Sequence, residues 1–535
     1  MFSVRFLYRL SPIPVQPTIY PSDCTIIIPT LDFAGSAYSH FTANLESILL
    51  NSPGAVSIVT VGKSNLDRLQ TLVQPLVKTY PCTSITCAAI PRANKRLQIT
   101  HAAARVTTKL TILTDDTVAY PARNFLRVAI APFEDQRVGC VGTHKRVVRE
   151  QQDSWDTSSW WQSFLNFLGC VYLERHNFET AATNALDGGV FVVSGRTLLI
   201  RTLILQDPAF VAEFTNERIL HCWSSIGIGN GNGIGPLNAD DDNFITRWLV
   251  RKRWKIKIQS NHIETRLGGG SHHQRQRPQR FFAQVLRWTR TTWRSNPRSL
   301  LLLSVSSQQP WTLYAVHLSS LFNFALLIDG LLLATLAPPP ASASRYYKSC
   351  YYGSLCAWIL GSKFIKLIAH FRRHPRDVVF FPGYVVFAYC HSFIKLYALL
   401  TCWDVAWSGR DLGVYDSGDD THDTRDDAHD DAHDDARDDV HDDAHDDVHD
   451  DAHDDAHDHT RDDAHDNAHD DAHDDAHDDA RGDVHDDAHD HTHDHDGGER
   501  DMARQRGEGE EGTRANIRPR KHAGWRSQGE CEVWR

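Results

Sequence analysis

The chain lacks the cysteine pairs that indicate a disulfide scaffold or a thiolate zinc site. Its eleven cysteines are scattered, and no two of them are spaced as C-x-x-C. Closely spaced cysteines are typical of small secreted domains, and paired cysteines are typical of structural zinc sites. Both classes are therefore disfavoured, and we expect reduced thiols that pack as small hydrophobic side chains.

Signals for export are also lacking. The first residues, MFSVRFLYRLSPIP, contain no apolar core long enough for a signal peptide, and residues 1–21 form a proline-rich lead. No N-x-S/T sequon occurs in the chain, so nothing marks a glycosylated exterior.

The net negative charge of the 535-residue chain comes from its C-terminal part. Residues 411–500 carry a net charge of −33, whereas the rest of the chain carries +21. From about residue 417 the sequence repeats DDAH, and such a segment buries too little apolar surface to offset its ordering entropy. We therefore expect residues 413–535 to be disordered. Their many histidines leave open a weak metal-binding or interaction tether as an alternative function.

Short apolar runs alternate with helical patterns over residues 22–300. Strands are predicted at 24–30, 56–61, 84–90, 109–114, 138–142 and 190–194, with helices that include 95–108, 155–176 and the segment after Asp242. This alternation is typical of an α/β fold with a mainly parallel sheet and helices on both faces. Ligands bind at the carboxyl ends of the strands in such sheets, and Asp115–Asp116 directly follows the fourth predicted strand.

Three polar groups in this region carry possible chemistry. Asp115–Asp116 is either a solvated turn or a site for a divalent cation that bridges a diphosphate. The run Asp240–Asp242 either caps the following helix or supplies a general base.

The third group is the motif QVLRW, in which Gln284, Arg287 and Trp288 share one helical face. This face either lies on a membrane surface or presents a guanidinium to phosphate oxygens and an indole to a sugar.

The composition changes after residue 300. Residues 311–337 are long and apolar enough to span a bilayer, and 350–370 form a second candidate that is weakened by two lysines. A third segment, 378–403, contains His391 and Lys395, so a re-entrant or interfacial position is predicted for it. Residues 301–412 are therefore expected to form a membrane region.

Together these motifs resemble the processive family 2 glycosyltransferases, with hyaluronan, chitin and fungal polysaccharide synthases as the most similar groups. The resemblance rests on the order of a strand-end DD, a DDD before a helix, Q-x-x-R-W and then apolar segments, over about residues 20–412. It implies a GT-A-type mixed sheet that binds a nucleotide sugar, followed by membrane helices.

The resemblance also implies roles for individual residues. Asp115 and Asp116 would hold Mg²⁺ or Mn²⁺ on the nucleotide diphosphate, and Asp242 would be the catalytic base. Nucleotide- or substrate-binding positions would be Lys95, Arg96, Asp241, Gln284, Arg287, Trp288, Trp407 and Arg410. The last two belong to a W-S-G-R run that is similar to the W-G-T-R of a gating loop, although Ser408 and Gly409 depart from that pattern.

The function implied is an inverting transfer of sugar from a UDP-sugar to a growing β-linked polysaccharide of the cell wall. The implied partners are this donor, the polysaccharide acceptor and the lipid bilayer, with no nucleic acid. The protein would be integral to the plasma membrane with its catalytic domain in the cytosol. Related synthases begin with transmembrane helices that are missing here, so an inactive or truncated remnant remains an alternative.

Overall fold

The computed structural model describes residues 7–31, 33, 36–149, 157–219, 234–238, 240–266, 278–335 and 344–405. All of these belong to one compact unit, residues 1–420. The predicted disordered tail, as well as Trp407 and Arg410, lies outside the described residues.

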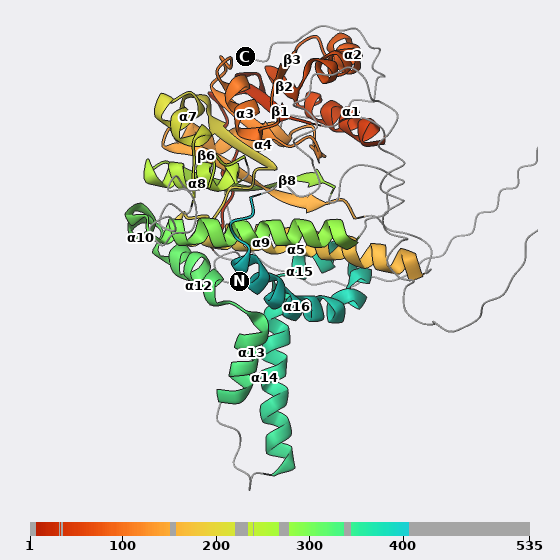
Figure 1. Cartoon of the computed structure of the whole chain (residues 1–535), viewed down its shortest axis with the longest axis vertical. Coiled ribbons are helices and arrows are strands. Elements are labelled where there is room, and N and C mark those ends of the chain that lie inside the picture. The colour runs from red at the N-terminus through yellow and green to blue at the C-terminus, as the bar shows by residue number, and fades with distance from the viewer. Residues whose placement is uncertain are drawn as a thin grey trace, which may run out of the picture. The chain divides into compact units, whose positions relative to one another are not determined.

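An eight-stranded mixed sheet forms the centre of this unit, in the order β3-β2-β1-β4-β7-β6-β8-β5 (Figure 1). The strands are β1 Cys24–Pro29, β2 Ala55–Val61, β3 Ser84–Ile90, β4 Leu110–Thr114, β5 Val118–Ala119, β6 Val138–Val147, β7 Thr197–Arg201 and β8 Lys255–Thr265. Strands β3, β2, β1 and β4 are parallel, whereas β7 is antiparallel to both β4 and β6. The expected mixed sheet is therefore present, with parallel pairing from β3 to β4 and again between β6 and β8.

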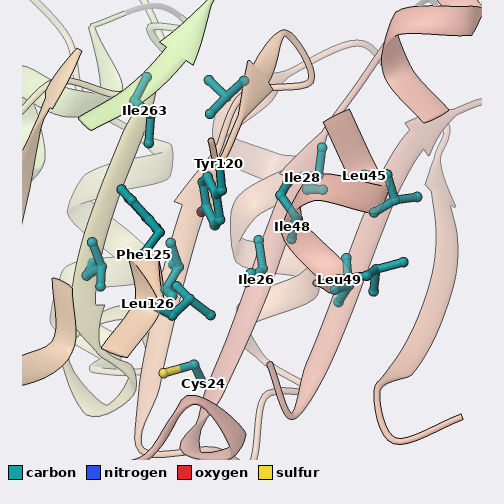
Figure 2. Close-up of a cluster of buried hydrophobic side chains, with 14 of the residues drawn as sticks. Cys24, Ile26, Ile28, Leu45, Ile48, Leu49, Tyr120, Phe125, Leu126 and Ile263 are labelled. Atoms are coloured by element: carbon teal, nitrogen blue, oxygen red, sulfur yellow. The ribbon is translucent and has the colours of Figure 1, made fainter. Parts of the chain in front are cut away.

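The side chains of β1 explain how the sheet is covered on both faces. All six residues of this strand are buried, and successive side chains point to opposite faces. Ile26 and Ile28 pack in one core cluster with α1 and α4, and Figure 2 shows them beside Leu45 and Ile48. Ile27 packs in the other cluster, with residues of α3, α7 and α8.

The helices that cover the sheet are interspersed with the strands. They are α1 Ser36–Leu49, α2 Lys63–Thr79, α3 Lys95–Ala103, α4 Phe125–Ile130, α5 Thr157–Asp187, α6 Thr202–Leu205, α7 Pro208–Thr215 and α8 Asp241–Arg251. The helices after β8 are α9 Pro278–Leu300, α10 Leu303–Gln308, α11 Pro310–Thr312, α12 Ser319–Phe322, α13 Ala325–Thr335, α14 Arg345–Ile365, α15 Ile368–Arg373 and α16 Phe381–Leu400.

One predicted strand, at 190–194, is wrong. The strand of this region is β7, which begins at Thr197. The backbone before it bonds to side chains of α8 instead of to a neighbouring strand: the Val193 N–H donates to Thr246 Oγ1 and the Gly195 N–H donates to Asp242 Oδ2, both at 3.0 Å. The apolar run is buried because it packs beneath α8.

The apolar C-terminal segments differ from expectation. Among the described residues, one continuous helical segment, Pro375–Leu400, is long and apolar enough to cross a membrane. The predicted re-entrant or interfacial position of 378–403 stays a prediction, because a helix of this length and composition can span a bilayer or lie along its surface. The first predicted span is instead broken, because 310–322 and 325–334 meet at 88°.

Side chains of α16 stabilise this break. Lys395 Nζ donates to the Asn323 carbonyl at 2.9 Å, and the Leu326 N–H donates to Ser392 Oγ at 3.2 Å. Lys395, one of the two residues that argued against a plain span at 378–403, thus satisfies a backbone carbonyl that the break exposes. Farther along, α13 and α14 run side by side (Figure 1) and are joined by an ion pair between Asp329 and Lys363.

Candidate functional site

The acidic pair lies where β4 ends, as predicted. Strand β4 ends at Thr114, which is paired with Thr197 of the antiparallel β7. The next residue, Asp115, donates its backbone N–H to the Arg196 carbonyl at 3.0 Å. This register places the acidic pair beside the residue that precedes β7.

Asp116 is oriented by the end of β1. Thr30 Oγ1 donates to Asp116 Oδ2 at 2.9 Å, and Asn44 Nδ2 donates to the Asp116 carbonyl at 3.1 Å. The Thr30 side chain therefore holds the second carboxylate of the pair and the Asn44 side chain holds its backbone, while both aspartates remain partly exposed.

Lys95 connects the two acidic motifs. Helix α3 begins at this residue, after Asn94, whose side chain accepts a hydrogen bond from the Leu97 N–H. Lys95 Nζ lies 3.0 Å from Asp115 Oδ1 and 3.2 Å from Asp241 Oδ2. Burial alone would lower the pKa of this ammonium, but the carboxylates of Asp115 and Asp241 outweigh it and raise the pKa.

Asp242 has the environment of a general base. Its Oδ2 accepts the Gly195 N–H at 3.0 Å, and its Oδ1 accepts the Asn243 N–H at 2.8 Å. Burial, followed by the charge of Asp241, raises the pKa of Asp242 to about 6. A carboxylate with a pKa in this range accepts a proton near neutral pH more readily than an ordinary aspartate.

Asp240, the first residue of the DDD run, contacts side chains of α9. It has a left-handed backbone with φ of 62° and forms an ion pair with Arg294, whose Nε lies 2.8 Å from Asp240 Oδ2. Thr291 Oγ1 also donates to its Oδ1 at 2.6 Å. Because Thr291 and Arg294 lie on α9, Asp240 fixes this helix against the first turn of α8.

Helix α9 carries the predicted Q-x-x-R-W face. Trp288 stacks on Tyr172 of α5 with 4.8 Å between ring centroids, and the Arg196 guanidinium lies 5.3 Å from the Trp288 ring centroid. Burial lowers the pKa of Arg287, while the carboxylates of Asp115 and Asp240 act in the opposite direction. Arg287 therefore lies within electrostatic range of both acidic motifs, and Gln284 lies one turn earlier on the helix.

The donor set fits a divalent cation that is shared with a ligand. No group of three or more His, Cys, Asp or Glu side chains converges in the part of the chain that the structure describes. Mg²⁺ is commonly held by one or two carboxylates together with waters and substrate phosphates. The hard oxygen donors of Asp115 and Asp116 suit such a cation, which would obtain its other ligands from a phosphate group.

The expectation that Arg96 contacts a nucleotide is contradicted by its position. This side chain is fully buried, and its guanidinium donates to the Phe214 carbonyl at 2.8 Å and to Glu217 Oε2 at 2.7 Å. It also lies over the rings of Phe214 and Phe244. Arg96 therefore ties α3 to α7 and α8, whereas its neighbour Lys95 faces the acidic motifs.

Two basic residues of the site were not predicted from the sequence. Arg196 precedes β7 and contacts Trp288, and Lys145 on β6 is buried with its Nζ 3.2 Å from His176 Nδ1. Burial, and then the charge of Arg196, lowers the pKa of Lys145 to about 7. Arg196 is a single basic residue in the largely apolar stretch VVSGRTLLI, which is a local signal that could have identified it, whereas Lys145 lies in the basic run HKR and has no such signal.

Comparisons with known proteins agree on one family. Residues 22–297 match the model described as "Glycosyltransferase like family 2". The chain is 38% identical over 411 residues to a "Type 2 glycosyltransferase" of Gibberella zeae, which covers 76% of this chain and 72% of the relative. A protein of the same name in Pyricularia oryzae is 36% identical over 427 residues, with 78% and 80% covered.

Two less similar proteins have more specific names. An "NDP-glycosyltransferase" of Aspergillus luteorubrus is 29% identical over 292 residues, which cover 54% of this chain and 64% of that protein. Among solved structures, the mannosyltransferase of Pyrobaculum calidifontis in complex with GDP-Man and Mn²⁺ is 14% identical, with 72% of this chain and 91% of that chain covered and a TM-score of 0.38.

Proposed function

The chain belongs to glycosyltransferase family 2 and is a glycosyltransferase, and from this premise we propose that it transfers a sugar from a UDP-sugar to a growing β-linked polysaccharide. One observation supports this proposal above all: Lys95 lies between Asp115 and Asp241, so that the strand-end acidic pair and the acids that begin α8 form one site. Such an assembly favours an active enzyme over an inactive remnant.

In the proposed reaction Asp242 acts as the base. A hydroxyl of the acceptor attacks the anomeric carbon of the donor sugar, the new glycosidic bond forms, and the bond to the diphosphate breaks with its electron pair. Asp242 takes the proton of the attacking hydroxyl. The Gly195 N–H holds Asp242 Oδ2, which leaves the orientation of this carboxylate defined before the substrate binds.

The leaving diphosphate requires positive charge beside it. Asp115 and Asp116 would hold Mg²⁺ or Mn²⁺, which neutralises developing negative charge on the leaving group when it is bound. Arg287 supplies a guanidinium that matches phosphate oxygens, and Trp288 offers an indole face to a sugar. Gln284, Trp407 and Arg410 are retained as proposed substrate- or nucleotide-binding residues.

We further propose that the bilayer is a partner, with the protein in the plasma membrane and the catalytic domain in the cytosol. Helix α16 exposes large apolar side chains, including Val386 at 61% and Phe393 at 64%, and Trp358 of α14 is 74% exposed. Apolar surface of this extent is typical of contact with another apolar phase. Helix α9, which carries the proposed substrate-binding residues Arg287 and Trp288, lies against α16 through Phe281 and Phe387, so this part of the proposed site adjoins these helices.

Transfer assays on the full chain test the proposed function. Membranes and detergent-solubilised protein would be incubated with individual radiolabelled UDP-sugars and Mg²⁺ or Mn²⁺, and the products sized by gel filtration. We expect a high-mass product with one UDP-sugar and none with the Asp242→Asn variant. Transfer confined to a small acceptor would contradict the polysaccharide assignment, and extraction of the protein by alkaline carbonate would contradict membrane insertion.

A further inference from the structure

Arg196 is a charged residue of the site, and the proposed reaction assigns it no role. It follows Gly195, which holds the base Asp242, and its carbonyl accepts the backbone N–H of Asp115. The residue therefore lies between the proposed base and the proposed metal-binding pair. Its backbone is fixed from both sides before any ligand binds.

The side chain of Arg196 is held over an aromatic ring. Its guanidinium carbon lies 5.3 Å from the centroid of Trp288, and this indole is stacked in turn on Tyr172. A guanidinium stacked on an aromatic face keeps its N–H groups directed outward in the plane of the fork. This stack of three side chains joins β7, α9 and α5 at one point.

The hydrogen-bonding state of Arg196 differs from that of other arginines nearby. Arg201, at the opposite end of β7, donates to the Val138 and Phe133 carbonyls, and Arg294 donates to Asp240 and to the Cys402 carbonyl. Within the residues that the structure describes, no nitrogen of the Arg196 guanidinium donates a hydrogen bond, although the side chain is half-buried. The N–H groups of this guanidinium are therefore available to the acceptor oxygens of a ligand.

The charges around Arg196 identify the kind of ligand. Burial lowers the pKa of Arg196, the carboxylates of Asp115 and Asp242 act in the opposite direction, and the guanidinium of Arg287 also lowers it. Two guanidiniums that face one acidic pair repel each other in the absence of an anion. A diphosphate has enough negative charge and enough oxygens to accept from both forks.

We propose that Arg196, held on the face of Trp288, is a second diphosphate-binding guanidinium that acts together with Arg287. The proposal rests on the proposed function, because it assumes a nucleoside diphosphate donor. Arg196 would contact the diphosphate of the bound donor and the leaving UDP, and it would leave recognition of the nucleoside unchanged.

Comparing the affinities for UDP and for uridine distinguishes diphosphate binding by Arg196 from a structural effect of its replacement. Isothermal titration of the full-length protein with UDP and Mg²⁺ would compare the wild type with Arg196→Ala, Arg196→Lys and the control Arg127→Ala, an exposed arginine of α4. We expect Arg196→Ala to weaken UDP binding by about 10- to 100-fold, as for loss of a hydrogen bond to a charged group. Uridine binding should not change, and Arg127→Ala should match the wild type.

Each outcome bears on one proposal. Equal UDP affinity in the wild type and Arg196→Ala would overturn the role of Arg196, and an equal loss for UDP and uridine would show a structural effect instead. If Arg196→Ala does not fold, UDP binding is measured with Arg196→Lys instead, which keeps the positive charge but lacks the planar guanidinium. That variant should bind UDP about 3- to 10-fold more weakly, and wild-type affinity would overturn the role. A wild-type protein that binds no nucleoside diphosphate would instead refute the proposed function.

Discussion

Lys95 and Asp241 form an ion pair of 3.2 Å between the first turn of α3 and the first turn of α8. The same ammonium lies 3.0 Å from Asp115, so one cation separates carboxylates that would otherwise repel each other. Both side chains of the pair are largely buried, at 11% and 10% exposure. The geometry of the two acidic motifs therefore depends on Lys95.

Replacing Lys95 by methionine should destabilise the protein by about 3–5 kcal/mol, because it leaves the buried Asp241 carboxylate without its counter-charge. Urea unfolding monitored by tryptophan fluorescence would measure the change. The matched control is Lys109→Met, which breaks an exposed pair with Asp23 and should cost at most about 1 kcal/mol. Similar losses in both variants would contradict the role of Lys95.

Replacing Asp242 by asparagine should lower turnover by about 100-fold or more while nucleotide binding persists, because only the proton acceptor is lost. In the wild type the base is ionised above its pKa of about 6, so turnover should rise with pH through that value. The residual rate of the asparagine variant should lack this rise. Loss of UDP binding in the variant would mean that Asp242 is structural or metal-bound.

The same substitution should increase stability at high pH. Burial raises the folded-state pKa of Asp242 above its ordinary value, so the ionised form costs stability once the pH rises above about 6. Asparagine removes this cost, and we expect a gain of about 1–3 kcal/mol at pH 8 that disappears below pH 4. Urea unfolding at the two pH values measures it, and a gain independent of pH would contradict the assigned cause.

Removing the metal should have the same effect as removing its ligand. Asp116→Ala should abolish transfer, and EDTA should abolish it in the wild type with recovery on addition of Mg²⁺ or Mn²⁺. Asp67→Ala, at an exposed aspartate of α2, is the control and should keep full activity. Full wild-type activity after the metal has been stripped away would refute the metal assignment.

The ion pair between Asp240 and Arg294 should couple α8 to α9. A double-mutant cycle with alanine at each position should give a coupling energy of at least about 2 kcal/mol in urea unfolding, because both side chains are less than one-tenth exposed. The exposed pair Glu213–Arg251 is the control and should couple by less than about 1 kcal/mol. Equal coupling in both cycles would show that α9 is held by other contacts.

The sequence predicted the elements whose signal is local. The all-apolar run of β1 and the spacing of α3 identified a buried strand and a covering helix, since side-chain periodicity follows directly from backbone geometry. The acidic pair at the end of β4 was located for the same reason. The strand predicted at 190–194 is wrong because the Val193 N–H bonds to Thr246 and the N–H of the following Gly195 bonds to Asp242, and both partners are distant in the chain.

The sequence by itself determined which residue types this protein brings to a strand end, a helix start and a helical face, and it determined the family through their order. The tertiary structure decided what each residue does. It separated Asp240, which binds Arg294, from Asp242, and it separated the interior Arg96 from Lys95 in the site. Adjacent residues point in different directions from a helix, and their partners come from segments that only the fold brings together. Local patterns therefore could not assign these roles, because burial and charge neighbours are properties of the folded chain.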